Sequence, residues 1–137
     1  MSYDYFLQAH IEGDDQVVMT SEVLRIFQPY AIEIADNYVD LDFGDAGSCT
    51  IFMEVSSPFI SGININCPCS AKELVDCLYD IMVLGNFVFF EPDGKNVIVL
   101  NEETIAHLPH GMTDSLGEAV VAESRDAFRQ LYQVNFS

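Results

Sequence analysis

The sequence predicts an α+β domain in two layers, an antiparallel sheet with helices mainly on one face. Strand-like segments follow one another across short turns, which favours antiparallel pairing, and helical segments fall between groups of strands. A ferredoxin-like core with an extra hairpin fits this order. The chain has 137 residues, of which 50% are hydrophobic, so we expect a single domain over residues 1–137 with its own core.

Alternating apolar and polar side chains predict the strands of the N-terminal half. Residues 3–11 alternate in this way, which predicts a first strand with one buried face. Helical spacing then predicts a short helix over 21–27, which ends before a proline. Alternation returns in 38–43 and 48–55, on the two sides of a glycine-containing turn, and predicts a hairpin. One more strand is expected at 62–66.

In the C-terminal half, the sequence predicts a helix, a second hairpin and two further helices. Ser70 followed by Glu73 matches a capping box, so we expect a helix to begin at Ser70. Its apolar stripe has helical spacing and consists of Leu74, Cys77, Leu78 and Ile81. The hairpin spans 86–100. Asn101 is expected to cap a short helix, and a last helix is expected over 113–133.

The 86–100 hairpin, with its turn at 91–95, has apolar side chains on both faces and therefore needs cover on both sides. We expect one face to carry Phe87, Phe89, Val97 and Val99, and the other to carry Val88, Phe90, Ile98 and Leu100. The C-terminal helix is one candidate for the cover. A second copy of the chain is the other, so the sequence leaves open a monomer and a homodimer formed through this hairpin.

The net charge is the strongest compositional signal. Five Lys and Arg residues against 22 Asp and Glu give −17 at pH 7. Such a chain repels nucleic-acid phosphates and anionic membrane surfaces, so neither is expected as a partner. The N-terminus lacks the basic and apolar segments of a secretion signal, and no apolar run approaches the length of a membrane-spanning helix. We therefore expect a cytoplasmic protein.

The acidic residues are uncompensated over one long stretch, because no Lys or Arg occurs between Arg25 and Lys72. If the 38–55 hairpin packs its aliphatic side on the helices, its other side carries carboxylates and aromatic rings. Aromatic rings supply binding energy at interfaces, and carboxylates attract a basic partner. We expect the partner-binding residues to be Tyr38, Asp40, Asp42, Phe52, Glu54 and, on the neighbouring strand, Asn64. The alternative is that these acids only keep a solvated face soluble.

The cysteines and histidines form no recognisable metal motif. Cys67 and Cys69 are too close together for the usual zinc spacing, and His107 and His110 flank a proline. Asp40 begins a stretch that resembles a calcium loop, but the glycine and glutamate that such a loop requires are missing. We therefore expect free thiols and no metal site.

Catalytic motifs are also missing from the sequence. It contains neither the glycine-rich motifs that hold nucleotides nor the Gly-x-Ser-x-Gly motif of hydrolases, so we expect no cofactor and no catalytic residues. A small enzyme or ligand-binding domain is kept as an alternative, with a pocket lined by Cys67, Cys77 or His107. His10 falls on the polar side of the first strand, where we expect it to be exposed.

The −17 charge, the one-domain α+β order and the stretch 74–94 together resemble the immunity proteins of bacterial polymorphic-toxin, contact-dependent-inhibition and type VI secretion systems. These are small, often acidic cytosolic proteins that bind a cognate toxin domain and block it. The resemblance implies a non-enzymatic inhibitor whose partner is a basic toxin domain. A nuclease is favoured, because its active-site cleft holds phosphates. The resemblance assigns no functional residue.

A DNA-mimic inhibitor is the other function that the charge allows. Phage anti-restriction and anti-CRISPR proteins are of this type. Such a protein would carry its carboxylates in rows spaced like phosphates and would bind many DNA-binding proteins.

Overall fold

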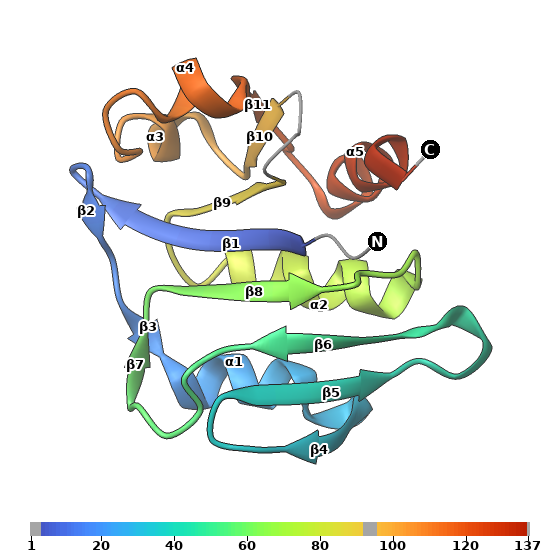
Figure 1. Cartoon of the computed structure of the whole chain (residues 1–137). Coiled ribbons are helices and arrows are strands. Elements are labelled where there is room, and N and C mark those ends of the chain that lie inside the picture. The colour runs from blue at the N-terminus through green and yellow to red at the C-terminus, as the bar shows by residue number, and fades with distance from the viewer. Residues whose placement is uncertain (1–3, 92–95, 137) are drawn as a thin grey trace.

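A computed structural model describes residues 4–91 and 96–136 and confirms the α+β class (Figure 1). Within this part of the chain, the main sheet has nine strands. Eight of them lie in the order β11 (Glu118–Val121), β10 (Asn96–Val99), β9 (Phe87–Phe90), β1 (Asp4–Ile11), β8 (Gly62–Asn66), β6 (Ser48–Phe52), β5 (Tyr38–Asp42) and β4 (Ala31–Ile34). The short β2 (Asp14–Asp15) pairs with β1 beside this path. Tyr3 and residues 92–95 of the expected turn lie outside the described residues.

The centre of the sheet has the connectivity of a ferredoxin-like core. Strands β9, β1, β8 and β6 are neighbours in this order, and each pair is antiparallel. Helix α1 (Thr20–Phe27) lies between β1 and β6 in the chain, and α2 (Lys72–Met82) lies between β8 and β9. This core is extended at both edges rather than by one hairpin. In the sheet, β5 and then β4 lie beyond β6 at one edge, and β10 and then the parallel β11 lie beyond β9 at the other.

Helices α1, α2 and α5 (Arg125–Phe136) cover one face of the sheet, and the main core lies between them and the strands. Strand β1 directs Tyr5 and Leu7 into this core, where both are fully buried. Phe89 of β9 meets two rings of α5, with centroids 5.5 Å away for Phe128 and 5.8 Å away for Tyr132. The predicted stripe of α2 is confirmed, because all four of its side chains are buried: Leu74, Cys77, Leu78 and Ile81.

The helix ends follow local sequence signals only in part. Helix α1 stops as predicted, at a 3-10 turn that contains Pro29. The predicted capping box is wrong: α2 begins at Lys72, and its N-cap position is held by Ala71, whose side chain has no hydrogen-bond acceptor. Asn101 caps α3 (Glu102–Ile105) as predicted, and accepts a 3.0 Å hydrogen bond from the Thr104 amide. None of the described helices is both long enough and apolar enough to cross a membrane.

The apolar hairpin of β9 and β10 is covered on both faces by the chain itself. Phe87, Phe89 and Ile98 face the main core. The other face forms a second cluster with apolar residues of α3, α4 (Met112–Leu116) and β11, and its members are Val88, Phe90, Val97 and Val99. The expected grouping is therefore wrong for β10, because Ile98 pairs with Phe89 and shares its face. Burial of this hairpin requires no second copy.

The single helix expected over 113–133 is interrupted at Gly117. This residue ends α4 with a φ of 110°, a conformation that favours glycine. The chain then forms β11, where the β-branched Val120 and Val121 suit a strand, before α5 begins at Arg125. As a result, the C-terminal helix covers one face of the 86–100 hairpin, and α3 and α4 cover the other.

His10 is only 5% exposed, so the expectation of an exposed histidine is wrong. Strand β2 turns back beside it and places Asp15 opposite His10. The segment after α3 closes the same end of the sheet, since the Glu12 amide donates a 3.1 Å hydrogen bond to His107 Nδ1. Burial lowers the pKa of His10 from its usual value, and outweighs the opposing effects of the Asp15 charge and the backbone of Asp14.

Candidate functional site

The face of the sheet opposite α1, α2 and α5 is only partly covered. Helices α3 and α4 lie over β9 and β10, whereas the described part of the chain places no helix over this side of β1, β8, β6, β5 and β4 (Figure 1). We call this region the open face. Its side chains alternate with those of the main core and are Asp4, Phe6, Gln8, Glu33, Tyr38, Asp40, Asp42, Ser48, Thr50, Phe52, Asn64 and Asn66.

Strand pairing aligns aromatic rings in one row across the open face. Tyr38 lies opposite Phe52, Phe52 opposite Asn64, and Asn64 opposite Phe6. Phe6 stacks on Phe90 with ring centroids 5.4 Å apart, and Phe90 is buried in the cluster under α3 and α4. This aromatic row therefore begins in a packed region and reaches solvent at Phe52, which is 43% exposed. Rings with little freedom and much accessible area are effective anchors at interfaces.

A polar row runs beside the aromatic row. It consists of Asp40, Thr50, Asn66 and Asp4 on four neighbouring strands. Thr50 Oγ1 donates a 2.6 Å hydrogen bond to Asp40 Oδ1, and Asn66 Nδ2 donates a 2.8 Å hydrogen bond to Asp4 Oδ1. Because both donors are uncharged, these bonds orient the two carboxylates and leave their negative charge in place.

Tyr38 extends this arrangement toward the edge of the sheet. Its hydroxyl donates a 2.9 Å hydrogen bond to Glu33 Oε1, and this bond, together with the charge of Glu33, raises the pKa of Tyr38. Asp42, further along β5, accepts a 2.8 Å hydrogen bond from the Gly44 amide. Here too, neutral donors fix the direction of the carboxylates.

The basic side chains of the described residues all lie in the helical layer. Arg25 belongs to α1, Lys72 begins α2, and Arg125 and Arg129 belong to α5. The arginines pair with acids of these same helices, namely Arg25 with Glu22, Arg125 with Asp76 and Asp80, and Arg129 with Asp76 and Asp126. Lys95 lies outside the described residues. Among the described residues, the open face thus carries carboxylates and no cation.

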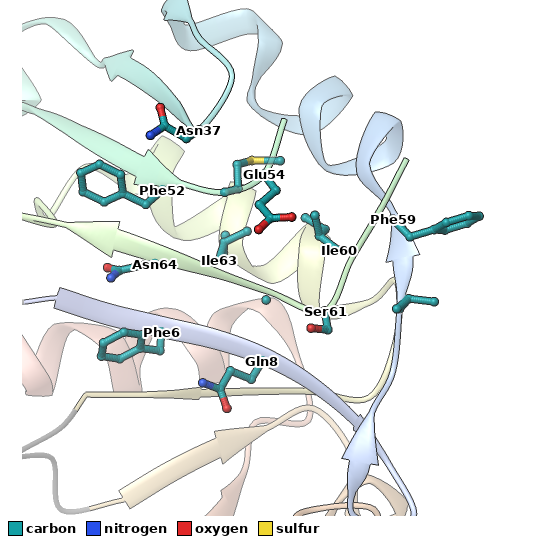
Figure 2. A pocket seen from close by; sticks show the side chains of 13 residues that line it. Phe6, Gln8, Asn37, Phe52, Glu54, Phe59, Ile60, Ser61, Ile63 and Asn64 are labelled. Atoms are coloured by element: carbon teal, nitrogen blue, oxygen red, sulfur yellow. The ribbon is translucent and has the colours of Figure 1, made fainter. Parts of the chain in front are cut away.

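A hollow of about 660 Å³ lies where the aromatic row meets the loops after β6 (Figure 2). The two-stranded sheet of β3 (Val18–Met19) and β7 (Phe59–Ile60) borders it. Figure 2 shows Phe6 and Phe52 on either side of Asn64, and the carboxylate of Glu54 directed toward Ile60 and Ile63. The hollow is therefore a continuation of the open face with both apolar walls and polar groups.

Five of the six residues expected to bind a partner lie together on the open face: Tyr38, Asp40, Asp42, Phe52 and Asn64. The sixth, Glu54, lies beyond the end of β6 and lines the hollow with Phe52 and Asn64. None of the six is sealed beneath a helix, since each is exposed or half-buried.

Strands β1 and β4 add four residues to this surface that were not expected there, Asp4, Phe6, Gln8 and Glu33. The alternation in β1 places Phe6 on the polar side of the strand, so the sequence indicates that Phe6 lies on this face of the sheet. Its position beside Asn64, however, depends on the pairing of β1 with β8.

The residues of the alternative pocket lie in different parts of the fold. Cys77 is buried in the helical layer, Cys67 is exposed just after β8, and His107 lies against the turn after β1. Burial raises the pKa of both Cys49 and Cys77 to about 12. In the part of the chain that the structure describes, no group of three or more His, Cys, Asp or Glu side chains is placed to hold a metal ion.

Comparison with known proteins gives no match to this chain among family models, curated proteins or solved structures. Functional inference therefore rests on the chemistry of the open face and the hollow.

Proposed function

We propose that this chain is a non-enzymatic inhibitor, an immunity protein that binds a cognate bacterial toxin domain and covers its basic active-site cleft. The observation that carries the proposal is the open face, where exposed aromatic and carboxylate side chains occur together and no described cation neutralises them. A nuclease cleft that holds phosphates is positively charged. Opposite potentials on the two surfaces would accelerate their encounter.

The two kinds of side chain would have different roles in such a complex. Asp40 and Asp42 are oriented carboxylates on one strand and would attract the toxin from a distance. Phe52 would supply apolar contact area near the centre of the interface. The inhibitor would act by occupying the cleft, without chemistry, in the cytoplasm where the nuclease would otherwise reach its substrate.

The arrangement of the acids favours a toxin inhibitor over a DNA mimic. Across the sheet, Asp40 and Asp4 are separated by the neutral Thr50 and Asn66, so the carboxylates do not form an unbroken row. The aromatic row beside them also has no counterpart in a row of phosphates. The experiment must therefore distinguish a toxin inhibitor from a DNA mimic.

The experiment uses the protein encoded next to this chain as the candidate toxin. We expect co-expression to restore growth, and the purified chain to inhibit the toxin with one-to-one stoichiometry. The failure of the two proteins to form a complex would contradict the proposal. Complete inactivation by a small fraction of one equivalent would indicate an enzyme, and equal inhibition of an unrelated DNA-binding protein would indicate a DNA mimic.

A further inference from the structure

We propose that the hollow receives an arginine side chain of the basic partner, which lies between Phe6 and Phe52 and pairs with Glu54. This inference rests on the proposed function and names the chemical group by which the partner is recognised. It follows from the walls of the hollow, its charge and its unused hydrogen-bond acceptors.

The two rings stand on either side of one position of the sheet, where a cation could lie between them. Phe52, Asn64 and Phe6 are register partners on three adjacent strands, and the rings stand on either side of Asn64 (Figure 2). Two interstrand spacings separate the backbones of Phe52 and Phe6 by about 10 Å. A cation above Asn64 would lie within the range of about 6 Å over which each aromatic ring attracts positive charge.

Glu54 supplies the opposite charge. It follows Phe52 by two residues, is exposed, and directs its carboxylate into the hollow (Figure 2). The described residues provide no cation that pairs with it. A guanidinium group can donate two parallel hydrogen bonds to such a carboxylate, which gives both strength and orientation.

The polar side chains of the hollow favour arginine over lysine. The amides of Gln8, Asn37 and Asn64 line it, and Asn64 Oδ1 is buried and accepts no hydrogen bond from the described residues. An unpaired buried acceptor is costly, and a donor that reached this oxygen would remove that cost. Arginine carries five N–H donors on a flat group that also stacks on rings, whereas lysine carries three on a compact ammonium.

The size of the hollow is consistent with a side chain that belongs to a protein. At about 660 Å³ it exceeds the needs of one arginine side chain. Phe6, Phe52 and Asn64 belong both to the hollow and to the open face. A partner docked on that face can therefore insert an arginine side chain into the hollow. The remaining space would then hold the flanking backbone of the partner.

The test is an NMR titration of the ¹⁵N-labelled chain with the blocked peptide acetyl-Gly-Arg-Gly-amide. The matched probe is the same peptide with citrulline, which has the shape of arginine without its charge. We expect saturable shifts with the arginine peptide alone, centred on the Asn64 side-chain amide and the backbone amides of Phe52 and Gly62. Glu54→Gln should weaken binding by about two- to fivefold. Glu123→Gln, an equal charge change after β11, should leave it unchanged.

Equal shifts with both peptides, or equal affinities in the two variants, would overturn the inference. The outcome is separable from that of the proposed function. If the chain inhibits the toxin and the arginine peptide does not bind, only the arginine site is wrong. If the peptide binds in the hollow and the toxin is not inhibited, the immunity function is wrong.

Discussion

Arg129 donates two hydrogen bonds to Asp76, from Nε to Oδ1 and from Nη2 to Oδ2, and each is 2.9 Å long. The pair joins α5 to α2, and Arg125 binds Asp76 and Asp80 beside it. The helical layer thus uses its few cations to neutralise its own acids. Among the described residues, no Lys or Arg lies on the opposite side of the sheet, where the acids of the open face are. The distribution of arginine therefore stabilises the fold and keeps the open face negative.

Removal of this ion pair should destabilise the fold. Because both side chains are mostly buried, at 27% and 30% exposed, we expect Arg129→Gln to lower the free energy of unfolding by about 1 kcal/mol. Urea denaturation measures this change. Arg25→Gln is the control, since Arg25 is largely exposed and lies 3.7 Å from Glu22. Equal effects of the two substitutions would contradict the role assigned to the α2–α5 pair.

Phe52 should matter more for binding than for stability. Its ring is 43% exposed, so Phe52→Ala removes little buried contact and should change the melting temperature only slightly. If the ring is an anchor of the interface, the same change should weaken toxin binding by about tenfold or more. Val83→Ala is the control, because Val83 is an exposed apolar residue at the end of α2. Calorimetry of both variants gives affinity and stability, and unchanged affinity for Phe52→Ala would argue against the anchor.

The buried thiols predict a loss of stability in alkali. Burial raises the pKa of Cys49 and Cys77 from 9.0 to about 12. Above pH 9 the unfolded chain therefore releases these protons while the folded chain keeps them. The stabilisation is complete below pH 9 and is lost as the pH rises toward 12. Between pH 9 and pH 12, each thiol should lower the free energy of unfolding by about 1.4 kcal/mol per pH unit.

Urea denaturation at a series of pH values measures this slope. The reference is Cys77→Ala, which removes one of the two thiols. Its free energy of unfolding should be lower at neutral pH, because a buried side chain is shortened, and should fall less steeply above pH 9. Parallel curves for the two proteins would show that the Cys77 thiol is not the source of the pH dependence.

Local sequence patterns were sufficient for the elements that have a clear period. The alternation in 38–43 and 48–55 correctly places Tyr38 and Phe52 on one side of a hairpin, and the strand at 62–66 places Asn64 on the same face. Much of the candidate site could therefore be predicted, since alternation alone decides which side chains share a face.

The remaining features depend on contacts between distant segments. Strands β2, β3 and β7 have two residues each and carry no period. Residues 113–133 contain enough apolar positions for a helix, but the chain turns at Gly117 and then pairs β11 with β10. The burial of His10 accompanies the pairing of β2 with β1, and the place of Phe6 in the aromatic row depends on strand β8. Such pairings leave no mark in a single sequence.

The central claim is that the charge of the open face draws a basic toxin to the chain, and the association rate tests it most directly. Reversal of two charges, Asp40→Lys with Asp42→Lys, should slow association at low salt by about tenfold or more and change dissociation much less. Glu118→Lys with Glu123→Lys makes the same change in net charge at the far edge of the sheet, and should slow association far less. If both double variants bind at the same rate, the open face is not the docking surface.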